Sequence, residues 1–287
     1  MNFDKYTKPI AMSDPGRHAA LFEGLPRDAG ALARMAQGLL VHQHLAPAYG
    51  VVLSREQQAQ SHIRAVEKIL DSILVRDRRS LSAPRSANEK QVGVCRNFTL
   101  LHIAMLRTQG IPARARCGFA AYFEKGKYLD HWVTELWDEG KRHWILFDAQ
   151  IDDRQREFFK IGFDPADVPR DQFVVAGDAW SLCRREKIDP GAFGILDMHG
   201  LWFIAGNFIR DVAALNNREM LPWDVWGAMA RQDDDLDRAL FDRLAIVSRE
   251  PDSYVNELDA LYSDKRVSVP AIVFNAQLNC MQSLAGS

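Results

Sequence analysis

The sequence predicts an α+β protein, and two adjacent patterns carry that prediction. Phe98, Leu101 and Met105 repeat at helical spacing, which is typical of a helix with one apolar face. Residues 128–137 and 142–149 are rich in aromatic and β-branched side chains and are separated by a short turn sequence. We therefore expect an antiparallel sheet packed on this helix, with additional N-terminal and C-terminal helices.

Helical patterns also precede this core. Apolar residues recur at helical spacing in residues 28–45 and again in residues 55–74. Residues 76–92 are polar and contain proline, so we expect them to form a loop that leads into the core helix and contacts substrate.

A second apolar helix is predicted within residues 197–211. Its polar residues Asn207, Arg210 and Asp211 are spaced to share one face. Charged groups in so apolar a segment need partners, which favours an internal network of ion pairs and hydrogen bonds. The alternative is that Arg210 binds a carboxylate or phosphate of a substrate, which its forked donors suit.

Three regions follow from these patterns. Residues 1–75 form an N-terminal helical region, residues 76–165 form the core, and residues 166–287 form a mainly helical C-terminal region. We expect one compact unit.

Composition excludes several function classes. The 287 residues are 47% hydrophobic and 26% charged with a net charge of −2, which is typical of a soluble globular protein. No basic stripe indicates nucleic-acid binding. No apolar run approaches the roughly 18 residues of a membrane span, and the N-terminus resembles no signal peptide. We therefore expect a cytoplasmic protein without nucleic-acid or membrane partners; the sequence predicts no oligomeric state.

Cys95 is placed to act as a nucleophile. It lies in the first turn of the predicted core helix, which ends at Gly110 with Pro112 just beyond. The unpaired N–H groups and the positive dipole end of a helix start favour a thiolate. The same N–H groups can bind the oxyanion of a tetrahedral intermediate.

The hairpin turn predicts a partner for a histidine. If Glu139 and Gly140 are the two loop residues, His131 lies directly opposite Asp148. Opposed side chains have Cβ atoms roughly 5 Å apart, within reach of a hydrogen bond. A bulge would break this relationship, because a one-residue slip reverses the face.

Together these residues resemble the transglutaminase-like superfamily. The resemblance covers about residues 85–150, with the remainder of the chain outside it. It rests on four linked segments in the family's order: GVCRN at 93–97, LRTQGIPAR at 106–114, YLDHWVTE at 128–135 and WILFD at 144–148.

The resemblance implies a papain-like fold and a catalytic triad. Cys95 would attack a carbonyl carbon, His131 would move the proton, and Asp148 would orient the imidazole. Family enzymes also use an oxyanion donor upstream of the nucleophile; Gln91 is the best placed candidate, with Asn88 as the alternative.

Other polar residues have simpler interpretations. Cys117, Cys183 and Cys280 are expected to be packing residues without a disulfide framework. His42 and His44 would point to different sides of a helix, so we expect no metal site and no cofactor. Several arginines near the core hint at an anionic substrate group, with Arg96 as a candidate for binding it; the others are Arg85, Arg114 and Arg116.

Three functions remain open. The first is a thiol hydrolase that cleaves an amide, peptide or related acyl bond of a small molecule or peptide through a thioester. The second is an acyltransferase that uses the same triad with an amine acceptor. The third is an inactive binding module, which loss of a triad residue would favour. No triad residue is lost, and hydrolase is the preferred interpretation.

Overall fold

The computed structural model describes residues 3–285 and divides the chain into two compact units. The N-terminal unit contains Phe3–Ala115 and Val133–Val168, and the C-terminal unit contains Arg116–Trp132 and residues 169–285. Helices and sheets alternate irregularly along the chain, which confirms the α+β class. The three-region division by sequence stays a prediction.

The largest sheet has the strand order β6-β3-β4-β7-β8, with β5 also paired to β4. Strand β4 is antiparallel to β5, as predicted, and it is also parallel to β7, so the sheet is mixed. A parallel neighbour needs a long crossover, which the chain between β5 and β7 provides. The strands are β3 (Ala113–Ala120), β4 (Tyr128–Asp138), β5 (His143–Phe147), β6 (Phe173–Val175), β7 (Phe193–Ile195) and β8 (Met198–His199).

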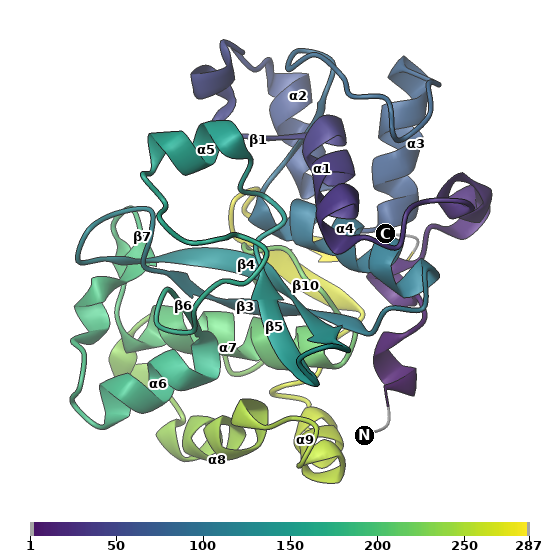
Figure 1. Ribbon diagram of the computed structural model, residues 1–287. Helices are drawn as coiled ribbons and strands as arrows, with labels where there is room; N and C mark the ends of the chain where they lie inside the picture. The colour runs from purple at the N-terminus through teal and green to yellow at the C-terminus, as the bar shows by residue number, and fades with distance from the viewer. Residues whose placement is uncertain (1–2, 286–287) are drawn as a thin grey trace. The chain divides into compact units, whose positions relative to one another are not determined.

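Helices α1 and α4 lie side by side in the N-terminal unit (Figure 1). Asp28 caps α1 by accepting a 2.6 Å hydrogen bond from the Ala31 N–H, as its residue type favours. His102 joins α4 to the sheet, because its ring bonds Thr134 of β4 at 3.0 Å. The helices of this unit are α1 (Ala29–Leu39), α2 (Arg55–Ala59), α3 (Val66–Arg76), α4 (Cys95–Thr108) and α5 (Asp153–Phe158).

A short parallel pair of strands replaces part of a predicted helix and a predicted loop. The helix expected over residues 28–45 ends at Leu39, and β1 (Leu40–His42) follows at once. It pairs with β2 (Gln91–Gly93), which lies in the segment expected to be a loop. The partners are 51 residues apart, since Leu40 faces Gln91, so no local pattern predicts them.

The C-terminal unit contains three helices, α6, α7 and α8, and α6 packs against both of the others (Figure 1). The predicted apolar helix is present as α7, although it begins at Leu201 because Met198 and His199 form β8. A small sheet has the order β11-β10-β9. The elements are α6 (Ala176–Arg184), α7 (Leu201–Leu215), α8 (Arg238–Arg249), α9 (Val255–Tyr262), β9 (Asp224–Val225), β10 (Ile272–Asn275) and β11 (Cys280–Ser283).

Short 3-10 helices connect these elements. They are Asp4–Tyr6, Ala11–Ser13, Gly16–Phe22, Ala46–Tyr49, Gln60–His62, Pro190–Ala192 and Asp233–Asp235. Within residues 3–285, no helix has the length and apolar character needed to cross a bilayer.

The polar residues of α7 form the internal network predicted for them. Asp211 accepts hydrogen bonds from Arg116 Nε at 2.9 Å and Nη2 at 2.8 Å, and from the Cys117 N–H at 2.9 Å. Arg210 Nη1 donates to Asn207 Oδ1 at 2.9 Å and Nη2 to the Asp224 carbonyl at 3.0 Å. Charges that are buried this completely require such pairing.

Candidate active site

Cys95 is the first residue of α4 and belongs to the N-terminal unit. Its side chain is 6% exposed. The predicted helix is confirmed at both ends, because Gly110 follows it with a left-handed φ of +73° and the Ile111 N–H bonds back to the Leu106 carbonyl at 3.0 Å. The thiol therefore lies at the end of the helix where anions are stabilised.

The helix start leaves its first N–H groups without a capping side chain. The residue before Cys95 is Val94, which has no side-chain acceptor and makes no cap hydrogen bond. Asn97 instead turns back and accepts a 3.0 Å hydrogen bond from the Val94 N–H. Serine or aspartate at position 94 would occupy a first-turn N–H group. Valine supplies no such oxygen, and the Asn97 N–H donates to the Val94 carbonyl at 2.8 Å instead.

Asp148 directly follows β5 and is 1% exposed. Its Oδ1 accepts a 3.0 Å hydrogen bond from the Gln150 N–H, and its own N–H donates to the Pro165 carbonyl at 2.8 Å. These bonds hold the carboxylate at the end of the strand in the N-terminal unit.

The β4/β5 register differs from the predicted one by two residues. Asp138 pairs with His143 rather than Lys141, so four residues, 139–142, form the turn. The Asp138 side chain stabilises this turn by accepting a 2.9 Å hydrogen bond from the Lys141 N–H. Arg142, the last residue of the turn, adopts a left-handed φ of +54°. Thr134 faces Phe147, which places Asp148 at the register position of Val133.

The direct pairing predicted between His131 and Asp148 is therefore wrong. A two-residue shift preserves the side of the strand, since side chains alternate with a period of two. His131 and Val133 point to the same side of β4.

His131 lies on β4 in the C-terminal unit and is 2% exposed. Three aromatic rings meet its imidazole edge-on. The ring centroids of Phe123, Tyr122 and Phe173 lie 4.9, 6.0 and 6.3 Å away, with interplanar angles of 84°, 89° and 70°. This packing restricts rotation of the imidazole and surrounds it with apolar surface.

The sequence predicts none of these aromatic contacts. Tyr122 and Phe123 lie just beyond β3, which ends at Ala120. Phe173 is far from His131 in sequence and reaches it because β6 pairs with β3, with Phe173 opposite Ala120.

Gln91 lies on β2 and is 1% exposed. Its side-chain oxygen accepts hydrogen bonds from Ser72 Oγ at 2.7 Å and Arg76 Nη2 at 2.6 Å. Two donors on the oxygen fix the orientation of the amide. Its NH₂ group makes a weak 3.4 Å contact with the Val92 carbonyl, so the donor end is the less occupied one.

The arginines near the core have internal partners. Arg96 is fully buried, and its Nη1 donates to the Arg64 carbonyl at 2.5 Å. Arg114 pairs with Glu135 at 2.7 Å and lies over the Trp144 ring, 4.0 Å from its centroid. Arg85 bonds three backbone carbonyls at 2.6 to 2.9 Å. These contacts give the arginines a structural role, and an anionic substrate group near them stays a prediction.

Arg210 is also part of a structural network, as described above. Burial lowers the pKa of its guanidinium, which Asp130 and Asp224 partly oppose. Its use as a substrate ligand stays a prediction, as does that of Arg96.

His42 and His44 are not on a helix, so the geometric reason given against a metal pair is wrong. His42 ends β1, and the two ring centroids are 5.6 Å apart. The His44 N–H donates to His42 Nδ1 at 3.3 Å. Among residues 3–285, no group of three or more histidine, cysteine, aspartate or glutamate side chains is arranged to hold a metal ion.

The comparison with protein families decides the identity of the central segment. Residues 53–149 match the model of the transglutaminase-like superfamily. This stretch belongs to that superfamily. It includes Cys95, His131 and Asp148, and it begins earlier than the segment whose motifs carried the resemblance. The transglutaminase-like stretch thus takes in α2, α3 and α4 as well as β2 to β5.

Solved structures similar to this chain include two from different organisms. A proposed cysteine protease from Cytophaga hutchinsonii is 19% identical with a TM-score of 0.35, and the match covers 62% of this chain and 48% of that one. Red sea bream transglutaminase is 18% identical with a TM-score of 0.30, over 45% of this chain and 22% of its own. The chain thus spans about half of the first structure and less of the second. No curated protein matches.

Proposed function

We propose that the chain is a cysteine-dependent hydrolase of an amide, peptide or related acyl bond. Cys95 is the nucleophile, His131 is the general base and acid, and Asp148 orients the imidazole. The observation that carries the proposal is the position of Cys95, at an uncapped helix start inside a transglutaminase-like stretch that also contains a buried histidine and a buried aspartate.

The reaction needs two proton transfers through His131. The imidazole takes the thiol proton as the sulfur attacks the carbonyl carbon, forming a tetrahedral intermediate with a negative oxygen. As the carbon–nitrogen bond breaks, the imidazolium returns the proton to the leaving amine, and a thioester remains on Cys95. Water, deprotonated by the imidazole, then attacks the thioester and releases the acid and the free thiol.

Two sets of donors serve the oxyanion in this proposal. The first is the N–H groups in the first turn of α4, which Val94 leaves uncapped. The second is the NH₂ of Gln91, whose oxygen is held by Ser72 and Arg76. Removal of an oxyanion donor typically lowers kcat by about 10²- to 10³-fold.

The surroundings of His131 support its role as proton carrier. Tyr122, Phe123 and Phe173 hold the ring edge-on, so the imidazole retains one orientation through both transfers. Apolar walls also strengthen the interaction of the charged imidazolium with a carboxylate, because the local dielectric constant is lower than in water.

An acyltransferase is the second candidate, and the low exposure of the catalytic groups favours it. Cys95 is 6% exposed and His131 is 2% exposed. A thioester shielded from bulk water survives longer and can meet an amine acceptor before hydrolysis. The two activities would share every catalytic residue. An inactive binding module is the third candidate, and all three triad residues are present.

Intact-mass spectrometry with a reactive ester tests the proposal. Incubation with 4-nitrophenyl acetate should add one acetyl group on Cys95, and the Cys95→Ala variant should lose that adduct and all turnover while retaining its circular dichroism spectrum. Cys280→Ala is the matched control, since Cys280 is an exposed cysteine, and it should behave as wild type. Equal acetylation of the Cys95→Ala variant would overturn the mechanism.

The fate of the acetyl group separates hydrolase from transferase. With hydroxylamine or a primary amine present, a hydrolase should release mainly acetate, whereas an acyltransferase should release mainly the acyl-amine product.

A further inference from the structure

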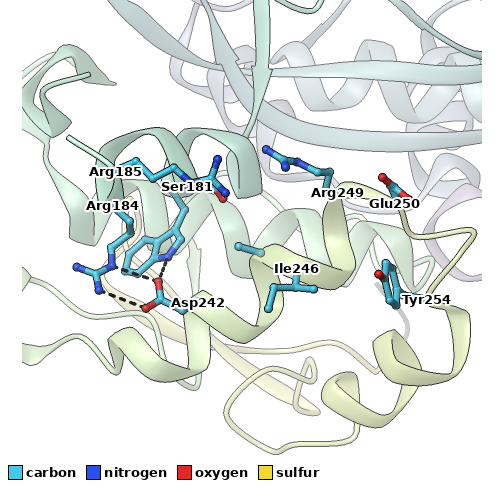
Figure 2. A pocket seen from close by; sticks show the side chains of 10 residues that line it. Ser181, Arg184, Arg185, Asp242, Ile246, Arg249, Glu250 and Tyr254 are labelled. Carbon is cyan, nitrogen blue, oxygen red and sulfur yellow. Dashed lines mark hydrogen bonds and ion pairs between the residues drawn. The ribbon is translucent and has the colours of Figure 1, made fainter. Parts of the chain in front are cut away.

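A pocket of about 340 Å³ opens between α6 and α8 in the C-terminal unit (Figure 2). Its lining residues fall between Trp180 and Tyr254, outside the transglutaminase-like stretch of residues 53–149. The volume is at the lower end of the range of small-molecule sites. The pocket lining therefore contains none of the three proposed triad residues.

One wall of the pocket is held by a charge pair. Asp242 accepts hydrogen bonds from Trp180 Nε1 at 2.8 Å, Arg184 Nε at 3.1 Å and Arg184 Nη2 at 3.2 Å. Arg184 lowers the pKa of the Asp242 carboxyl, with Trp180 contributing, so the carboxylate stays ionised. Arg184 and Asp242 thus neutralise each other and leave the recognition of a ligand to other side chains.

Two other arginines face the pocket with donors to spare. Arg249 uses its Nε for a 3.3 Å bond to Asp178, which leaves its Nη groups directed toward the pocket (Figure 2). In the part of the chain that the structure describes, Arg185 has no ion pair or side-chain hydrogen bond. The guanidinium groups of Arg185 and Arg249 extend toward one another in Figure 2. An anion between them would relieve their repulsion and accept charge-assisted hydrogen bonds from both.

The opposite end of the pocket is apolar and carries one negative charge. Ile246 is 63% exposed and lies between the arginines and the Tyr254 ring (Figure 2). An apolar group placed over Ile246 would remove this surface from water. Glu250 lies beyond it beside Tyr254, where its carboxylate would repel a second negative group on the ligand.

We propose that this pocket binds a small organic anion, with a carboxylate or phosphate between Arg185 and Arg249 and an apolar body over Ile246 that reaches toward Tyr254. The charge pattern selects a ligand with its negative charge at one end. The ligand is a small molecule because the pocket is short and bounded by Glu250.

Calorimetric titration of the full chain tests the recognition chemistry. The probes are benzoate, phenyl phosphate, inorganic phosphate and the neutral isostere benzamide. Benzoate or phenyl phosphate should bind at millimolar or lower concentrations, the preferred one of the two identifying the headgroup. Inorganic phosphate should bind more weakly than phenyl phosphate, and benzamide should not bind. Absence of binding by both aromatic anions, or equal binding of benzamide, would overturn the proposal.

Three variants test the assignment of the side chains. Combined Arg185→Ala and Arg249→Ala substitutions should lower the affinity for the anion by roughly tenfold or more. Glu250→Gln should raise this affinity by about threefold, because a repulsive charge is removed. Arg243→Ala, an exposed arginine of α8 that does not line the pocket, is the matched control and should bind as wild type.

Circular dichroism of each variant shows whether the helices remain folded. If the folded double variant binds the anion as tightly as the Arg243→Ala control, the two arginines do not form the site and the proposal fails.

Discussion

Asn207 Nδ2 donates a 2.8 Å hydrogen bond to Asp130 Oδ1, so a residue of α7 holds the strand residue next to His131. The other end of the Asn207 amide accepts from Arg210 at 2.9 Å. Burial raises the pKa of the Asp130 carboxyl, while Arg210 and Asn207 oppose that rise. The amide therefore links a buried cation to a buried carboxyl group.

Asn207→Ala should destabilise the C-terminal unit. The substitution leaves Asp130 and Arg210 each without one hydrogen-bond partner in a buried setting, at a cost of about 1 to 3 kcal/mol per group. Urea unfolding followed by circular dichroism measures the loss. Asn216→Ala is the control. Asn216 directly follows α7 and is half-buried, so its substitution should lower the free energy of unfolding by less. A larger loss for Asn216→Ala would contradict the importance of the Asp130 contact.

Asp211→Ala should be among the most damaging single substitutions. It would leave the Arg116 guanidinium buried without its partner, which typically costs about 3 to 5 kcal/mol. The midpoint of thermal unfolding reports this effect. Asp264→Ala removes a carboxylate from the solvent-exposed pair with Arg266 and should change the midpoint little. Similar midpoints for the two variants would argue against a buried ion pair.

Acid should weaken the protein through His102. Its Nε2 donates to the Ala29 carbonyl at 3.0 Å, so the neutral ring accepts the 3.0 Å hydrogen bond from Thr134 at Nδ1. Burial lowers the pKa of His102 from 6.5 to about 4.

The unfolded chain therefore binds more protons than the folded one in this pH window. The stabilising contribution is complete above pH 6.5 and is lost as the pH falls toward about 4, by on the order of 3 kcal/mol. Urea midpoints at several pH values should fall less steeply for His102→Gln than for wild type; parallel curves would contradict this origin.

Alkylation should single out Cys95. In the proposed triad His131 takes the proton of the Cys95 thiol, so the sulfur reacts with an electrophile more readily than a thiol without such a base. Burial raises the pKa of Cys183 to about 12, and Cys280 is exposed without such a partner in the proposal. Peptide mapping after iodoacetamide treatment should find Cys95 modified before Cys280, and His131→Ala should slow Cys95 alone. Faster modification of Cys280 would contradict an activated Cys95.

Local patterns predicted the elements best. The helix that starts at Cys95 was predicted correctly, because Gly110 and the apolar repeat are signals within a few residues of it. The apolar helix containing Arg210 was also predicted, together with the internal character of its polar network.

Relationships set by backbone conformation or distant partners were not predicted. The turn after β4 depends on the left-handed φ of Arg142, and arginine is not a residue type that favours this conformation. The pairing of β1 with β2, and the approach of Phe173 to His131, depend on segments brought together by tertiary packing. The ion pairs of Arg114 and Arg116 are not predictable for the same reason, since their partners Glu135 and Asp211 are distant in sequence.

Valine at position 94 has a further consequence for how this protein could change. A serine there would stabilise the helix by about 1 kcal/mol. Its oxygen would, however, compete for the N–H groups that the proposed mechanism uses to bind the oxyanion. An aspartate would add a negative charge beside the sulfur and disfavour the thiolate. Greater helix stability and the proposed chemistry therefore favour different residues at this single position, and selection for heat resistance alone would be expected to lower the proposed activity.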